Sequence, residues 1–190
     1  SPQWIATEYN STNRPDLFAS FGSEEPYFCS GAPGPYYVQS RSQSYPSASQ
    51  AQITLPYATT AGDLLVLSLV ANQSLSVSSV MDSVNGINRY NLVSMTNVGT
   101  WGKLYTYYLN NSLGGGPITA TVTLNGAATT FNVSFLEYGG VARVDPLDQS
   151  SSGSGSGTAM DSGSRTITSA PELIYGFGAG ISPCSGTAPY

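Results

Sequence analysis

Residues 118–138 read Ile118-Thr-Ala-Thr-Val-Thr-Leu-Asn-Gly-Ala-Ala-Thr-Thr-Phe-Asn-Val-Ser-Phe-Leu-Glu-Tyr138. Apolar and polar side chains alternate on both sides of Asn125-Gly126, and this is the period of a half-buried strand. An Asn-Gly pair tolerates the positive φ that a tight turn requires. The stretch therefore predicts two β-strands, 118–124 and 130–138, joined by a hairpin turn.

The chain from residue 51 onward repeats this pattern. Short apolar or alternating runs are separated by Gly, Asn, Ser and Asp, and no window has the apolar period of a helix. Asp82–Gly86, which ends in Asn-Gly, predicts a second hairpin turn. Further strands are expected at 51–55, 64–72, 75–80, 90–95, 101–109, 165–168 and 173–177. This succession predicts an all-β sandwich of the jelly-roll type over residues 51–190.

Residues 1–50 have a different character. They are rich in Pro, Ser, Tyr and Gln and show weak periodicity. Gly31-Ala-Pro-Gly-Pro35 predicts a stiff turn, because proline fixes φ and glycine adopts positive φ. We therefore expect an extended N-terminal arm, 1–50, ahead of the sandwich.

The composition excludes several classes of function. The chain has no histidine, six basic and eleven acidic residues, and 46 serines and threonines. Without histidine, Ser-His-Asp and Cys-His catalysis and most zinc sites are excluded. A net charge of −5 offers no basic patch for nucleic acid, and no apolar run is long enough for a membrane span. We expect a protein that is not an enzyme and has no cofactor.

The two cysteines, Cys29 and Cys184, indicate an oxidising compartment. A disulfide between them is favoured in a chain of this composition. A redox-active pair is the alternative, but the Cys-x-x-Cys spacing is missing. The first residue is serine, which suits a cleaved secretion signal. The sequence thus predicts a secreted protein, extracellular or at the cell surface.

Five motifs occur in one order along residues 50–180. They are Ala61-Gly-Asp-Leu-Leu-Val66, Val77-Ser-Ser-Val-Met-Asp-Ser83, Phe135-Leu-Glu-Tyr-Gly-Gly140 with Asp145-Pro-Leu-Asp148, and Pro171-Glu-Leu-Ile-Tyr-Gly176. In this order they resemble a group of bacterial extracellular β-sandwich modules with AGDLLV, VSSVTDS, LEYSG, DPLD and NELIFG motifs. The resemblance implies a sandwich and a secreted context, and it implies no activity.

The chain departs from that group at its C-terminal end. Members of the group continue for several tens of residues after the last motif, whereas this chain ends at Tyr190. Either a C-terminal portion is missing from the chain or the sandwich lacks one strand. A sandwich without one strand exposes unpaired N–H and C=O groups, which attract a strand from a neighbour. The arm offers a candidate donor strand whose successive side chains would point to opposite faces: Gln3, Trp4, Ile5, Thr7 and Tyr9. Residues 181–190 are the next candidate.

Three sets of side chains are candidates for a binding or covalent site. Carboxylates at turns and strand ends could hydrolyse glycosides or bind Ca²⁺. They are Asp63, Asp82, Glu137, Asp145, Asp148 and Glu172. The alternative is that turn aspartates form hydrogen bonds with their own backbone, as they usually do. Trp101, Tyr105 and Tyr107 share one strand face, which could stack on sugar rings or pack into a core. Lys103, the only lysine, could form an isopeptide bond near Glu137 or extend along a sheet face.

Sequons for N-glycosylation occur at Asn10, Asn72, Asn110 and Asn132. Asn132 lies in a predicted core strand, which argues against its use. We therefore expect a glycoprotein with acceptors among the other three. The first functional prediction is a fimbria-like structural subunit that polymerises with copies of itself through donor strands. The alternative is a secreted module that binds polysaccharides, other glycans or a surface, and a hydrolase ranks third.

Overall fold

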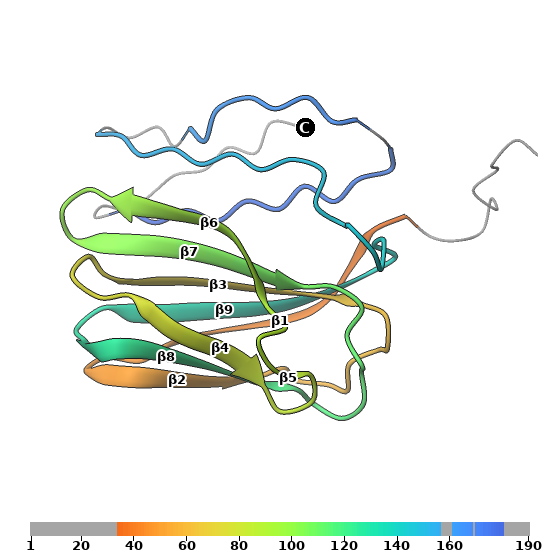
Figure 1. Cartoon of the computed structure of the whole chain (residues 1–190), viewed down its shortest axis with the longest axis horizontal. Coiled ribbons are helices and arrows are strands. Elements are labelled where there is room, and N and C mark those ends of the chain that lie inside the picture. The colour runs from red at the N-terminus through yellow and green to blue at the C-terminus, as the bar shows by residue number, and fades with distance from the viewer. Residues whose placement is uncertain (1–33, 157–160, 169, 181–190) are drawn as a thin grey trace, which may run out of the picture. The chain divides into compact units, whose positions relative to one another are not determined.

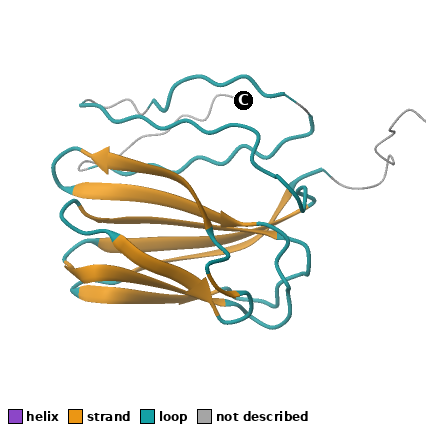
Figure 2. Cartoon of the chain, in the orientation of Figure 1, coloured by secondary structure: helices purple, strands orange, loops and turns teal. Residues whose placement is uncertain are grey.

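The structure is a computed structural model that describes residues 34–156, 161–168 and 170–180. These residues form strands and loops without any helix (Figures 1 and 2). The strands are β1 (Tyr36–Ser44), β2 (Ala48–Thr54), β3 (Leu64–Asn72), β4 (Val77–Asp82), β5 (Gly86–Ile87), β6 (Asn91–Val98), β7 (Gly102–Leu109), β8 (Thr119–Ala128) and β9 (Phe131–Gly139). The predicted strand over 64–72 is confirmed with the same bounds.

Two antiparallel sheets face each other, as Figure 1 shows. The five-stranded sheet has the order β1-β9-β3-β7-β6, and the four-stranded sheet has the order β2-β8-β4-β5. The pairs β1–β9, β2–β8, β3–β7 and β4–β5 are nested in the sequence and alternate between the sheets. This nesting is the jelly-roll arrangement, to which β6 adds an edge strand. The predicted all-β sandwich is confirmed.

The core lies between the sheets and consists of alternate residues of the central strands. Leu65, Leu67 and Leu69 of β3 meet Val133 and Phe135 of β9 there, and all five are at most 1 % exposed. Successive side chains of a strand point to opposite faces. The apolar residues that recur at every second position therefore all point into the space between the two sheets. Burying each large aliphatic or aromatic side chain contributes about 1.5–3 kcal/mol.

The segment that follows β9 covers the outer face of the five-stranded sheet, away from β2, β8 and β4 (Figure 1). Val66, Ser68 and Val70 of β3 point to this outer face and are nevertheless buried. The hydroxyl of Tyr175 donates a hydrogen bond to Ser68, and its ring packs edge-on against Tyr138. Central strand β3 is therefore buried on both faces, which explains its continuous apolar sequence.

The predicted strands at 165–168 and 173–177 are wrong. The described residues after β9 belong to no strand ladder. From Leu173 to Gly180 half-buried and exposed residues still alternate, and Ile174 is 86 % exposed. The alternation arises because every second side chain packs on the face of a sheet. A period of two therefore indicates extended backbone with one packed side and does not by itself indicate a ladder partner.

The predicted hairpin at Asn125-Gly126 is also wrong. Strand β8 continues through this pair to Ala128, and β8 and β9 belong to different sheets. Asn125 instead ties β8 to the link before β4: its N–H bonds the carbonyl of Ser76, and its side chain accepts the N–H of Ser76, both at 3.0 Å. The second predicted turn is confirmed, because Asp82 pairs with Gly86 in the β4–β5 hairpin.

The predicted boundary between arm and sandwich at residue 50 needs correction. Strands β1 and β2 begin at Tyr36 and Ala48, so residues 36–50 belong to the sandwich. The sequence hides β1 because this edge strand buries only Gln39 completely, and its other residues are polar or exposed. Residues 1–33 lie outside the described residues.

Candidate functional site at the open edge of β4

Strand β4 has an incomplete set of neighbours. On one side it pairs with β8 along its length, with an irregularity between Val77 and Ser79. On the other side β5 pairs only with Met81 and Asp82. Residues 77–80 thus have no strand partner on that side among the described residues, and such an edge is a template for strand addition.

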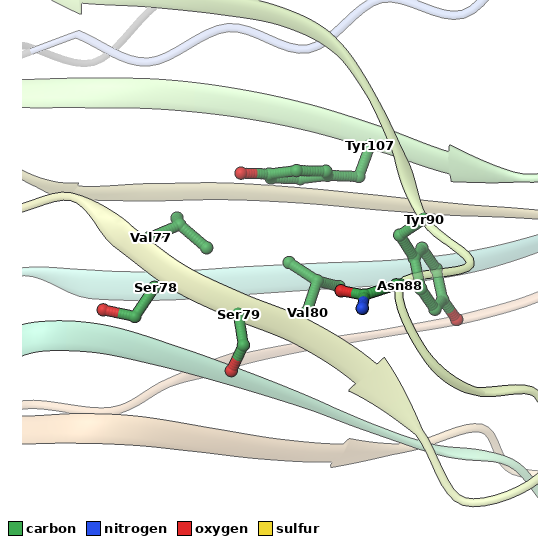
Figure 3. Close-up of a pocket in the computed structure, with 7 residues that line it drawn as sticks. All are labelled: Val77, Ser78, Ser79, Val80, Asn88, Tyr90 and Tyr107. Carbon is green, nitrogen blue, oxygen red and sulfur yellow. The ribbon is translucent and has the colours of Figure 1, made fainter.

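A groove of about 180 Å³ runs along this free edge (Figure 3). Its lining consists of Val77, Ser78, Ser79, Val80, Asn88, Tyr90 and Tyr107. Val77 and Val80 point from β4 toward the ring of Tyr107, whereas Ser79 points away from it (Figure 3). The groove therefore has an apolar and aromatic wall beside the free edge of β4. We name it the β4 groove.

A turn centred on Asp82 builds one end of the β4 groove. Asp82 is 2 % exposed. Its Oδ1 accepts the N–H groups of Val84 and Asn85 at 2.8 and 2.5 Å, and its Oδ2 accepts the hydroxyl of Tyr90 at 2.8 Å. Burial, together with the adjacent Asp82 carboxylate, raises the pKa of Tyr90 well above 10.0. Tyr90 is therefore a neutral donor whose ring is fixed beside the β4 edge.

The predicted aromatic binding face does not exist as an open surface. Tyr105 and Tyr107 lie on the face of β7 that points into the sandwich, where Tyr105 is 6 % exposed and belongs to the core. Trp101 precedes the first residue of β7. The Tyr105 and Tyr107 rings are stacked with centroids 6.3 Å apart. Burial and the nearby Tyr105 raise the pKa of Tyr107 to about 12. Of this row, the two residues that border surface hollows are Tyr107, in the β4 groove, and Trp101, in a shallow hollow with Thr130 and Asn132.

The acidic residues do not form a catalytic cleft in the described part of the chain. Glu137 is fully buried and accepts hydrogen bonds from Gln39 and from the N–H of Thr60, and Asp63 is 7 % exposed. Asp148 accepts hydrogen bonds from the N–H and hydroxyl of Thr168, and these bonds lower its pKa. Asp145 is exposed. A glycosidase needs two carboxyl groups facing an open substrate site, and Glu137 does not face one. In the same residues no three His, Cys, Asp or Glu side chains gather around a metal position.

Lys103 does not lie near Glu137, so the isopeptide interpretation is wrong for that pair. In the five-stranded sheet Lys103 is opposite Ala71, and Glu137 is opposite Leu65. Leu65 and Ala71 are six positions apart in β3, which corresponds to about 20 Å at 3.3 Å per residue. Lys103 is half-buried and donates to the carbonyl of Leu75 at 3.3 Å.

Two predicted glycan acceptors already use their side-chain amides. The Nδ2 of Asn72 donates to Thr129 at 2.9 Å, and the Nδ2 of Asn110 donates to the carbonyl of Arg143 at 2.6 Å. A glycan on either would replace one of these hydrogen bonds. Asn132, which we expected to be in the core, is exposed on β9.

Several predicted features lie outside the described residues. They are the disulfide between Cys29 and Cys184, the acceptor Asn10, and the donor strand with Gln3, Trp4, Ile5, Thr7 and Tyr9. Of the residues that line the β4 groove, sequence reasoning proposed only Tyr107 as a site residue; it missed residues 77–80, and also Asn88 and Tyr90. Only the Asn-Gly turn signalled that a short hairpin would bring Asn88 and Tyr90 back to β4.

Comparison with known proteins gives no relative: no family model, no curated protein and no solved structure matches the chain. Among the residues that the structure covers, there is no helix long and apolar enough to cross a membrane. Functional argument therefore rests on the β4 groove and on the chemistry of the side chains.

Proposed function

We propose that this protein is the structural subunit of an extracellular filament or surface appendage, assembled by strand complementation between copies. The observation that carries the proposal is the free edge of β4 beside an aromatic groove. Within the described part of the chain, residues 77–80 have no strand partner on one side. A strand from a second copy would pair with them, and main-chain hydrogen bonds would supply the affinity.

The β4 groove suits an added strand in side-chain terms as well. Val77 and Val80 point toward Tyr107, so an inward side chain of the added strand would contact three apolar surfaces. A volume of about 180 Å³ accommodates one aliphatic side chain. The outward side chains would remain in solvent, as on any edge strand. The donor therefore needs an apolar side chain at the position that faces the groove.

The N-terminal segment is the first candidate donor. As a strand, Gln3-Trp-Ile-Ala-Thr-Glu-Tyr9 would place Ile5 and Tyr9 on one face and Trp4 on the other, so either face offers an apolar side chain to the groove, and 26 residues separate Tyr9 from Tyr36, the first residue of β1. At about 3.3 Å per extended residue such a tether could reach a neighbouring copy. Residues 181–190 are the second candidate donor.

The composition supports an extracellular setting for this assembly. Seventeen charged residues against 46 serines and threonines give a hydrated surface with few charges, and the two cysteines suit an oxidising compartment. We propose Cys29–Cys184 as an intrachain disulfide, and glycans as additions to this surface.

The test is electron microscopy of negatively stained protein with and without residues 1–13. Full-length protein should form long filaments that appear as a ladder in SDS gels, and the truncated protein should remain a folded monomer. Ser78→Lys places a charge at the exposed β4 edge and should also block assembly. Ser74→Lys, in the exposed loop before β4, is the matched control and should polymerise normally. Normal filaments from both the truncated protein and Ser78→Lys would refute the proposal.

A second candidate function is a polysaccharide-binding module that uses the same groove. The Tyr107 ring is half-buried along the groove, whose lining also includes Asn88, Ser78 and Ser79, although Ser79 points away from the ring. An aromatic ring face with nearby amides and hydroxyls is a common arrangement for binding sugar rings. Monomeric protein that binds a polysaccharide, with binding lost in Tyr107→Leu, would favour this function over the filament.

A further inference from the structure

A buried carboxyl pair lies at the end of the sandwich opposite the β8–β9 turn. Glu137 of β9 is fully buried, and Asp63, just before β3, is 7 % exposed. In the β3–β9 ladder Glu137 lies opposite Leu65, so Asp63, two residues before Leu65, is the diagonal neighbour of Glu137 when that register is extended. Two carboxyl groups can share a hydrogen bond only when one of them carries a proton, because a carboxylate is an acceptor alone. The pair can therefore share a proton only while Asp63 is protonated.

Gln39 connects this pair to the edge strand β1. Its Nε2 donates to Glu137 Oε2 at 2.5 Å and to the carbonyl of Tyr57 at 3.1 Å, and its Oε1 accepts the N–H of Tyr57 at 2.8 Å. Glu137 Oε1 accepts the N–H of Thr60 at 2.8 Å. Gln39 is the one fully buried side chain of β1. The carboxyl pair thus joins β1, β9 and the loop before β3.

The surroundings of the pair favour its protonated form. Burial, and then the charge of Glu137 and the hydrogen bond to it, raise the pKa of Asp63 from 3.8 to about 6, while Arg143 offsets part of the rise. The Arg143 guanidinium lies over Gly62, whose φ is +96°. On the β1 side the neutral amide of Gln39 donates a hydrogen bond to Glu137, and on the loop side the N–H of Thr60 does so. Asp63 Oδ2 has no hydrogen-bond partner in the described structure, so its ionised form would be poorly solvated.

We propose that Asp63, Glu137 and Gln39 form a pH-sensitive latch that holds β1 on the sandwich and loosens when the carboxyl pair loses its shared proton. Loss of that proton places two negative charges side by side in a buried site. The repulsion is relieved when the loop before β3 moves outward and releases Gln39. Because residues 1–33 precede β1 in the chain, the latch controls how firmly the attachment point of the N-terminal arm is held.

The direction of the pH effect follows from proton binding. Between the unfolded pKa of Asp63, near 3.8, and its folded pKa, about 6, the native state binds more protons than the unfolded state. Stability therefore falls as pH rises through this interval and reaches a lower plateau above it. We expect the unfolding equilibrium constant to rise about tenfold to a hundredfold between pH 4 and pH 7.

The experiment combines urea unfolding with amide hydrogen exchange at several pH values. Wild-type protein should lose stability as pH rises, and protection should fall in β1 and residues 55–63 but not in β7. Asp63→Asn mimics the protonated side chain and should abolish both effects. Glu137→Gln, a second variant in case the first fails to fold, should do the same.

Asp145→Asn is the matched control, because it removes one exposed carboxylate elsewhere. It should retain the full pH dependence. The latch is refuted if Asp63→Asn or Glu137→Gln keeps the wild-type pH dependence. It is equally refuted if β1 protection in the wild type does not change more than that of β7 over this pH range.

Discussion

The hydroxyl of Tyr175 lies 2.9 Å from the hydroxyl of Ser68, although 107 positions separate the two residues in the chain. Ser68 is fully buried in the middle of β3, on the face that points away from the core. Its own hydroxyl is 3.3 Å from that of Thr106, to which it donates. This contact joins the irregular segment after β9 to the central strand of the five-stranded sheet, and it explains how a serine is accommodated in an otherwise apolar strand.

Removing the Tyr175 hydroxyl should destabilise the protein moderately. Tyr175→Phe leaves the ring in place but deletes the donor to Ser68, so we expect a loss of about 1 kcal/mol in the free energy of unfolding. Urea denaturation measures this loss. Combining Tyr175→Phe with Ser68→Ala should give less than the sum of the two single losses, whereas strict additivity would show that the bond contributes nothing.

Removing the Asp82 carboxylate should open the end of the β4 groove. In Asp82→Ala the N–H groups of Val84 and Asn85 lose their acceptor, and so does Tyr90, at a cost of about 3 kcal/mol. Tyr90 should become mobile, which its side-chain NMR signals or quenching of its fluorescence would report. Asp161→Ala, which removes an exposed carboxylate that accepts the N–H of Gly163, should change stability by less than 1 kcal/mol. Equal losses in the two variants would contradict the role assigned to Asp82.

Gly114 and Gly116 should respond differently to alanine. A Cβ at Gly114 would overlap the backbone of Ala61 and Thr60, and the φ of Gly114 is +68°. A Cβ at Gly116 meets nothing within 4 Å. We expect Gly114→Ala to cost about 3 kcal/mol and Gly116→Ala to be near neutral, as measured by thermal unfolding. A neutral Gly114→Ala would mean that the loop does not lie against residues 60–61.

Alkaline titration should reveal the buried tyrosines. Burial raises the pKa of Tyr107 to about 12 and that of Tyr90 well above 10.0. The unfolded state therefore releases these protons at lower pH than the native state, and stability should fall as pH rises above 10. Phenolate absorbance should show a late step that coincides with loss of near-ultraviolet circular dichroism. In Tyr107→Phe that late step should be smaller, and an unchanged step would show that Tyr107 titrates with the exposed tyrosines.

The strands with one apolar face could be predicted from the sequence because their periodicity reflects burial directly. Leu64–Asn72 is the clearest case, since both of its faces are covered and its apolar run has no interruption except Ser68. Strand β1 could not be found this way, because an edge strand whose one buried side chain is Gln39 carries no apolar alternation. Residues 173–177 were predicted to be a strand but belong to none. The prediction was wrong because packing on a sheet face produces the same alternation as pairing in a ladder.

The β4 groove illustrates why the candidate site was only partly predictable. Tyr107 was singled out from the alternation of aromatic residues in its strand, but the sequence could not reveal whether that face is open or closed. The second sheet closes it over Tyr105, whereas the short hairpin β4–β5 leaves Tyr107 beside the groove. Tyr90 reaches the groove through its bond to Asp82, a contact between residues eight positions apart.

The sequence by itself determined the class of structure: an all-β sandwich whose strands alternate, without histidine and with few charges. These are properties of single residues and of their near neighbours, and burial in a sheet imposes them locally. Tertiary structure alone decided that Asn125-Gly126 lies within a strand, that Gln39 meets Glu137, and that β4 keeps a free edge. Each depends on which strands become neighbours across the two sheets, and pairing between segments distant in the chain is not encoded in the period of any one of them.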